Sequence, residues 1–117
     1  YTAQRIQFDR PVASFQAVKH KCADMFIKIE AARSAVYAAA VADETEKTEA
    51  AILAKAYASD AFFDVAGDAI QLHGGIGFTW EYPLHFFFKR ARANRAMFGS
   101  SSHDYDLLAS RVLGETV

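Results

Sequence analysis

The chain has 117 residues, 52% of them hydrophobic and 23% charged, which is enough apolar material to bury the core of one small domain. Its 23 alanines greatly outnumber its 6 glycines and 2 prolines, and this composition predicts an all-helical protein. A formal net charge of -1 excludes the strongly basic surface that attracts nucleic acids and anionic lipids, so we expect no nucleic-acid partner.

A single cysteine, Cys22, excludes an intrachain disulfide and a cysteine-based metal site, and it fits a reducing, cytoplasmic compartment. No stretch approaches the about 18 uninterrupted apolar residues of a membrane span, so none is expected. The opening residues, Tyr1 to Ile6, are typical neither of a signal peptide nor of a start at methionine. We therefore interpret residues 1–117 as one domain of a longer protein.

The first ten residues are predicted to be the tail of an earlier helix, which ends before Pro11. A long helix is expected from Gln16, because its apolar residues advance by alternating steps of four and three. These residues are Val18, Cys22, Met25, Ile29, Ala32 and Val36. On this pattern Cys22 is a small, buried hydrophobic residue. The charged run at residues 43–47 is interpreted as an exposed connection to the next helix.

Three more helices follow from the same kind of pattern. The second is predicted from Thr48 to Leu72 and must stop at Gly74-Gly75, since glycine is the favoured residue after a helix. The third is predicted from Pro83 to Phe98, and the fourth from His103 to Leu113 with Ser102 as its N-cap. Short connections between these helices predict an up-and-down four-helix bundle.

The most unusual stretch is the glycine-rich end of the second helix, with Gly74, Gly75 and Gly77 in four positions and three aromatic residues after them. One interpretation is a helix end whose aromatic side chains hold a loop onto the bundle. The other is a binding site for a cofactor with phosphates and rings, because glycines let backbone N–H groups approach a ligand. The stretch is not a P-loop, since no Gly-Lys-Ser/Thr follows it.

Several motifs in this region resemble one known family. The stretch from Gln71 to Phe78, then Glu81-Tyr82-Pro83 and the basic run Lys89-Arg90-Ala91-Arg92, closely resemble the C-terminal signature of the acyl-CoA dehydrogenase family. Further similarity at residues 1–8 and 15–25 extends the resemblance over essentially the whole chain. The sequence of these motifs is most similar to that of actinobacterial heteromeric enzymes for sterol side-chain thioesters. The resemblance implies a four-helix bundle, in agreement with the predicted helices.

The resemblance also implies a flavoprotein. Members of this family bind FAD, act on acyl-CoA substrates, and usually form dimers of dimers in which this domain reaches the FAD of a neighbouring subunit. A homo-oligomer or hetero-oligomer is therefore expected. The positions assigned to the cofactor by resemblance are Arg5 at the diphosphate with Gln16 nearby, Gln71, Gly74 and Gly75 beside the adenosine diphosphate, and Ser100 and Ser102 as polar contacts.

One position departs from the family pattern. Many members place the glutamate that removes the substrate's α proton where this chain has Phe98, and a phenyl ring cannot accept a proton. Three explanations stay open: a glutamate on a preceding helix, a pair of unlike subunits of which one lacks the base, or a non-catalytic role. The chain alone is expected to catalyse nothing. The sequence of this chain does not distinguish an acyl-CoA dehydrogenase from an acyl-CoA oxidase.

Two further expectations concern partners. Phe86, Phe87 and Phe88 are consecutive on a helix and cannot all face one core, so at least one is expected to meet another subunit or domain. The four histidines lack the spacing of metal ligands, so no metal site is expected. The competing hypothesis is a helical interaction module that binds a protein partner and no flavin.

Overall fold

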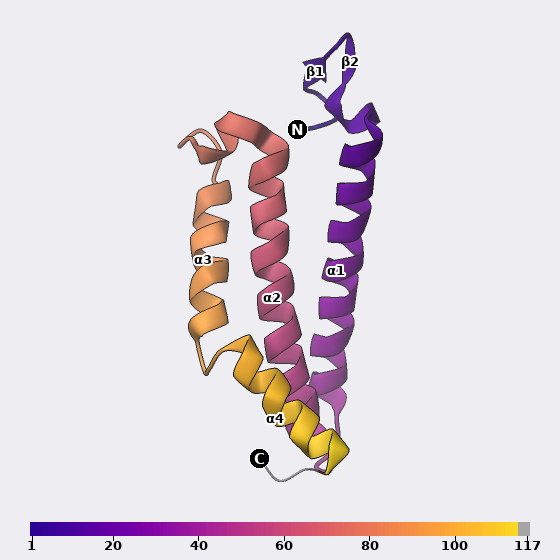
Figure 1. The fold of residues 1–117 in the computed structure, drawn as a ribbon, viewed down its shortest axis with the longest axis vertical. Coiled ribbons are helices and arrows are strands. Elements are labelled where there is room, and N and C mark those ends of the chain that lie inside the picture. The colour runs from indigo at the N-terminus through magenta and orange to yellow at the C-terminus, as the bar shows by residue number, and fades with distance from the viewer. Residues whose placement is uncertain (115–117) are drawn as a thin grey trace.

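A computed structural model describes residues 1–114, and these residues form an all-α fold with four α-helices (Figure 1). The helices are α1 (Gln16–Val41), α2 (Lys47–His73), α3 (Leu84–Ala96) and α4 (Ser101–Leu113). Shorter elements are β1 (Ile6–Gln7), β2 (Arg10–Pro11) and the 3-10 helices η1 (Val12–Ser14) and η2 (Gly74–Phe78). The predicted helical class is confirmed. In this described part of the chain, no helix combines the length and apolar character needed to cross a membrane.

Helix α2 is the centre of the arrangement. It packs against α1 on one side, and against α3 and α4 on the other. As Figure 1 shows, α1, α2 and α3 alternate in direction, whereas α4 continues in the general direction of α3 and crosses the lower half of α2. Helices α3 and α4 have 13 residues each, so together they cover the 27-residue length of α2.

Small side chains allow these close contacts. The buried hydrophobic residues in the described part of the chain are Ala54, Ala56, Ala61, Ala66 and Ile70 of α2 and Ala91 of α3. Alanine loses no side-chain entropy on burial and lets helix backbones approach closely, which gives the high alanine content a structural purpose. Gly67 lies at such a contact, since a Cβ atom placed there would stand 3.6 Å from the ring of Phe88.

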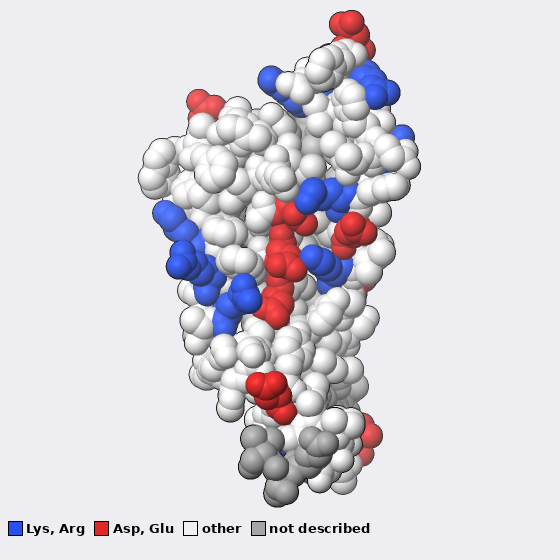
Figure 2. All heavy atoms as spheres, in the orientation of Figure 1, with Lys and Arg blue, Asp and Glu red and all other residues white. Residues whose placement is uncertain are grey.

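A stripe of carboxylates on α2 joins it to its neighbours. Residues four apart on a helix share one face, and Figure 2 shows the resulting acidic stripe between basic groups on both sides. The pairs are Asp60 with Arg95 at 2.9 Å, Asp64 with Lys28 at 2.9 Å, and Asp68 with Lys21 at 2.7 Å. The hydrogen bond to Asp64 raises the pKa of Lys28. Because these groups are partly exposed, each pair contributes only about 0–1 kcal/mol to the free energy of unfolding. Their main effect is to favour one alignment of the helices.

The first ten residues are not the helix tail that the sequence predicts. Strands β1 and β2 pair antiparallel, and the two residues between them, Phe8 and Asp9, have φ angles of 51° and 60°. Positive φ at both central positions is the backbone of a two-residue hairpin turn, and a right-handed helix cannot pass through it. The prediction fails because phenylalanine is uncommon at such a turn and no glycine marks its second position.

The helix boundaries agree with the prediction except around the α3–α4 joint, which we define as residues 97–100. Helix α3 ends at Ala96, two residues before the predicted Phe98, because Met97 is already extended, with a ψ of 136°, and Phe98 then has a φ of 60°. The N-cap of α4 is Ser100, whose Oγ accepts a hydrogen bond from the backbone N–H of His103 at 3.3 Å. The predicted N-cap, Ser102, instead lies inside the first turn of α4.

The prediction that Cys22 is buried is wrong, since this side chain is exposed. No residue of α1, which lies wholly within the described part of the chain, is fully buried. Val18 and Met25 are half-buried, whereas Ile29 and Val36 are exposed like Cys22. Helix α1 packs mainly against α2, so the apolar face that its sequence predicts is wider than the surface it buries.

The three consecutive phenylalanines of α3 diverge as expected from helix geometry. The ring of Phe88 packs against Phe63 of α2, with 5.1 Å between the ring centroids. Phe86 and Phe87 are both exposed. A contact of these two rings with another subunit stays a prediction.

The tight core yields a first testable prediction. Ala91 has no exposed surface, so Ala91→Leu should force α3 away from α2 and lower the free energy of unfolding by roughly 1–3 kcal/mol. Ala93→Leu, on the exposed side of the same helix, serves as the control. Urea denaturation of both variants measures the difference. Equal stability of the two variants would contradict the close packing of α3 on α2.

Candidate functional site

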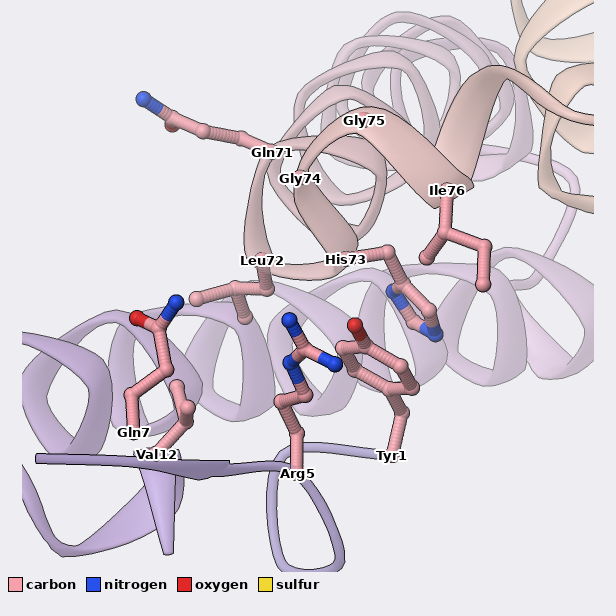
Figure 3. A pocket seen from close by; sticks show the side chains of 10 residues that line it. All are labelled: Tyr1, Arg5, Gln7, Val12, Gln71, Leu72, His73, Gly74, Gly75 and Ile76. Carbon is pink, nitrogen blue, oxygen red and sulfur yellow. The ribbon is translucent and has the colours of Figure 1, made fainter. Parts of the chain in front are cut away.

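A cavity of about 420 Å³ lies between the N-terminal residues and the end of α2 (Figure 3). We call it the Arg5 hollow. Its lining residues are Tyr1, Arg5, Gln7 and Val12 from the N-terminal segment and Gln71, Leu72, His73, Gly74, Gly75 and Ile76 from the glycine-rich end of α2. The glycines and Arg5, far apart in the sequence, thus meet in one place.

The three glycines at this end of α2 serve different structural purposes. Gly74 has a φ of 62°, which ends the helix as predicted. A Cβ atom on Gly74 or Gly75 would have no atom within 4 Å, so the backbone at both positions is open. A Cβ on Gly77 would instead stand 2.8 Å from the carbonyl oxygen of Ile70, so Gly77 is needed for close packing. The stretch therefore both holds a loop onto the bundle and exposes backbone to the hollow.

Arg5 supplies the positive charge of the hollow. It precedes β1, and its guanidinium group projects toward the end of α2 (Figure 3). Within residues 1–114 no carboxylate lies within ion-pair distance of Arg5. Arginine carries five donors in a planar fork that suits a phosphate group. Its position therefore fits an anionic ligand in the hollow.

Aromatic contacts hold the N-terminal residues against α2. The ring of Tyr1 stacks on the ring of His73 with 4.4 Å between centroids and 20° between planes, and the ring of Tyr82 meets both edge-on. The Nδ1 atom of His73 lies 2.7 Å from the carbonyl oxygen of Ala69, which orients the imidazole. Tyr1 and His73 are not among the predicted site residues. No sequence signal pairs them, because they are 72 positions apart.

The two other predicted residues of this group, Gln71 and Gln16, do not supply a polar group to the hollow. Gln71 is on its border, but its amide points away from the space around Arg5 (Figure 3). Gln16 opens α1 and does not line the hollow, and its Nε2 atom lies 2.8 Å from Nε2 of His20. Of the predicted residues, Arg5, Gly74 and Gly75 are thus the three that converge.

Ser100 and Ser102 lie in a second place, at the α3–α4 joint. They border a groove together with Phe63, Arg92 and Arg95. The 13 residues of α3 separate this groove from η2, a span of roughly 20 Å at the rise of an α-helix. One chain therefore does not gather all the predicted cofactor residues into a single pocket.

Phe98 occupies the α3–α4 joint and is 88% exposed. It has a left-handed backbone, which is uncommon for residues other than glycine. Its side chain offers no group that accepts a proton. In residues 1–114, moreover, no group of three or more His, Cys, Asp or Glu side chains could hold a metal ion.

The family model described as the C-terminal domain of acyl-CoA dehydrogenases matches residues 1–113. The chain belongs to the acyl-CoA dehydrogenase family. The match includes both the Arg5 hollow and the α3–α4 joint. It confirms the resemblance on which the cofactor positions were assigned, although those assignments stay predictions.

Similar proteins agree in sequence and in fold. Acyl-CoA dehydrogenase IpdE2 of Mycobacterium tuberculosis is 42% identical over 112 residues, which cover 96% of this chain and 34% of that protein. The steroid ACAD Tcur3481-Tcur3483 is 36% identical with a TM-score of 0.86, over 97% of this chain and 32% of that one. An acyl-CoA dehydrogenase from Bacillus anthracis, complexed with FAD, is 26% identical with a TM-score of 0.80. The match covers 99% of this chain and 25% of that one. The chain thus spans about a third of the length of IpdE2.

A second prediction follows from the difference between the packed Gly77 and the open Gly75. Gly77→Ala should lower the free energy of unfolding by roughly 1–3 kcal/mol, because its methyl group meets the Ile70 backbone. Gly75→Ala should change it by less than about 0.5 kcal/mol, because its methyl group meets nothing. Thermal unfolding followed by circular dichroism measures both. A Gly75→Ala variant as unstable as Gly77→Ala would show that the backbone of the hollow is not open.

Proposed function

We propose that this chain is the C-terminal helical domain of an FAD-dependent acyl-CoA dehydrogenase, in a longer protein that also has an N-terminal helical domain and a middle β-domain. The reaction is the α,β-dehydrogenation of an acyl-CoA thioester. The observation that carries the proposal is the convergence of Arg5 with the open backbone of Gly74 and Gly75 in one hollow. Family membership and the length of IpdE2 support it.

The residues of the hollow fit part of an FAD molecule. The guanidinium of Arg5 would bind the diphosphate, and the backbone beside Gly74 and Gly75 leaves room for the adenosine diphosphate part to approach. A Cβ atom at either glycine would take up that room. When bound, FAD accepts the hydride from the β carbon of the substrate. The Bacillus anthracis relative, which is complexed with FAD, supports this choice of cofactor.

The separation of the two cofactor groups supports a site shared between subunits. The Arg5 hollow would contact the FAD of a neighbouring subunit, while Ser100 and Ser102 would contact a different one. Each chain then takes part in two flavin sites, as a dimer or a dimer of dimers requires. The exposed Phe86 and Phe87 supply apolar surface for such an assembly.

The α3–α4 joint of this chain does not supply the base for the reaction, because its residue at that position is Phe98. The base would come from a glutamate on a preceding helix or from an unlike partner subunit. Similarity to the steroid ACAD Tcur3481-Tcur3483 supports the second source and a sterol side-chain thioester as substrate. Phe98 itself would form an apolar part of the acyl pocket. A cytoplasmic location stays a prediction.

The interaction module is the alternative function. The surface of α1 favours it, since Phe26, Ile27 and Tyr37 are exposed large side chains on one helix. Such a module would bind a protein partner through these side chains and would not need Arg5. Flavin binding therefore separates the two functions.

A third prediction tests the cofactor. In the full-length protein, Arg5→Ala should weaken FAD binding about tenfold or more, because hydrogen bonds to charged groups contribute about 1.5–3 kcal/mol. Gln71→Ala should lower FAD occupancy less, because its amide points away from the hollow. The ratio of flavin to protein absorbance measures both.

Arg33→Ala is the control for lost charge, because within residues 1–114 Arg33 pairs only with Glu30, one turn away on α1. It should leave the flavin content unchanged. Unchanged flavin content in Arg5→Ala and Gln71→Ala as well would favour the interaction module over the flavoprotein.

A fourth prediction concerns activity. The purified 117-residue chain, given FAD and an acyl-CoA, should form no enoyl-CoA, because Phe98 cannot take a proton. Product analysis by mass spectrometry provides the measurement, with the full-length protein and its partner subunits as the positive control. Enoyl-CoA formed by the chain alone would contradict this assignment.

A further inference from the structure

The α3–α4 joint is held from the side by a lysine of α2. The ammonium group of Lys55 donates a hydrogen bond to the carbonyl oxygen of Gly99 at 2.6 Å and another to Oδ2 of Asp104 at 2.7 Å. The Asp104 side chain is only 9% exposed and that of Lys55 22%. The part-buried bond to Asp104 is therefore weakly screened, and it fixes the ammonium group beside the more exposed Gly99 carbonyl. Lys55 therefore binds both the backbone of the joint and the first turn of α4.

A carboxylate of α2 holds the joint from its other end. Oδ1 of Asp60 accepts a hydrogen bond from the hydroxyl of Ser101 at 2.7 Å and pairs with Nε of Arg95 at 2.9 Å. Arg95 belongs to the last turn of α3, and Ser101 is the first residue of α4. Lys55 and Asp60 thus bind the chain on both sides of Phe98.

The joint needs such restraint, because its own backbone preferences oppose its shape. Phe98 and Gly99 have φ angles of 60° and 105° in succession. A left-handed conformation is disfavoured for phenylalanine and persists only where surrounding contacts over-determine it. A β-carbon also clashes there with its own carbonyl, so nothing in Phe98 itself maintains the conformation. The contacts that maintain it come from α2.

We propose that Lys55 and Asp104 are positioning residues that fix Phe98 and Ser100 where the flavin and the acyl group meet. This inference rests on the proposed function, which places the α3–α4 joint in that site. Asp104 holds the ammonium group of Lys55 in place, and Lys55 transmits this position to the joint through the Gly99 carbonyl. A shift of about 1 Å at such a site can cost about a hundredfold in rate.

A second ion pair between the same two helices provides a matched control. Arg111 of α4 donates to Glu49 of α2 at 2.9 Å, and this bond lowers the pKa of the Glu49 carboxyl. The pair joins α2 and α4 far from residues 97–100 in both helices. Its loss removes a link of the same kind without touching the joint.

The test uses the full-length protein loaded with FAD and any partner subunits. Lys55→Met combined with Asp104→Leu removes both charges together, so that no unpaired charge stays buried and the fold is kept. Glu49→Gln is the control. Hydrogen exchange read by mass spectrometry reports on the peptide of residues 97–104, and acyl-CoA titrations followed by flavin absorbance report on the site.

We expect exchange in the peptide of residues 97–104 to become about tenfold faster in the double variant, since the joint opens locally once α2 releases it. Acyl-CoA affinity should fall about tenfold in the same protein. Glu49→Gln should alter neither by more than about twofold. The single variant Lys55→Arg can still donate to both acceptors. It should keep the exchange rate and the acyl-CoA affinity within about threefold of those of the parent protein.

Two outcomes would overturn the inference. One is equal exchange of this peptide in the double variant and in Glu49→Gln. The other is a loss of acyl-CoA affinity in Lys55→Arg as large as the loss in the double variant. Failure of the proposed function has a different signature: the parent protein binds no FAD, yet exchange still rises in the double variant. In that case Lys55 positions the joint as inferred, but for a site of another kind.

Discussion

The contact of every other helix with α2 is the constraint on which the rest of the structure depends. Helix α2 has two faces with different contacts. Small residues such as Ala56 and Ala66 let neighbouring helices approach closely, whereas carboxylates such as Asp60 and Asp64 pair with cations from α3 and α1. Burial supplies most of the attraction, and the partly exposed ion pairs add alignment. Because α1 packs mainly against α2, much of its apolar face stays exposed.

This central helix also determines where the two groups of predicted cofactor residues lie. Its C-terminal end presents open glycine backbone to Arg5, while its middle holds the α3–α4 joint through Lys55. The two places lie at opposite ends of α3, so under the proposed function one domain would contribute to two flavin sites, one through each place. A net charge close to zero is no obstacle to a diphosphate ligand, since one unpaired arginine and exposed backbone donors act locally.

The helices were predictable where one local cause dominates. The start of α1 at Gln16 and the end of α2 at Gly74 follow from periodicity and from the glycine at the helix end. The hairpin at Phe8 and Asp9 was not predictable, because both residues take a left-handed backbone that neither prefers. Burial of Cys22 was mispredicted for another reason, since apolar spacing identifies a face and not the neighbour that covers it.

The amino-acid sequence by itself determined the helical class and which residues can bind phosphate or accept a proton, because these depend on composition, local spacing and side-chain chemistry. Its motifs also identified the family, through their resemblance to a known signature. It thereby showed that Phe98 cannot be a base. Only the tertiary structure decided that Tyr1 stacks on His73, that Arg5 faces the glycines, and that Lys55 binds the joint. These contacts join residues more than 40 positions apart, and their geometry depends on how α2 packs rather than on any local preference of the chain.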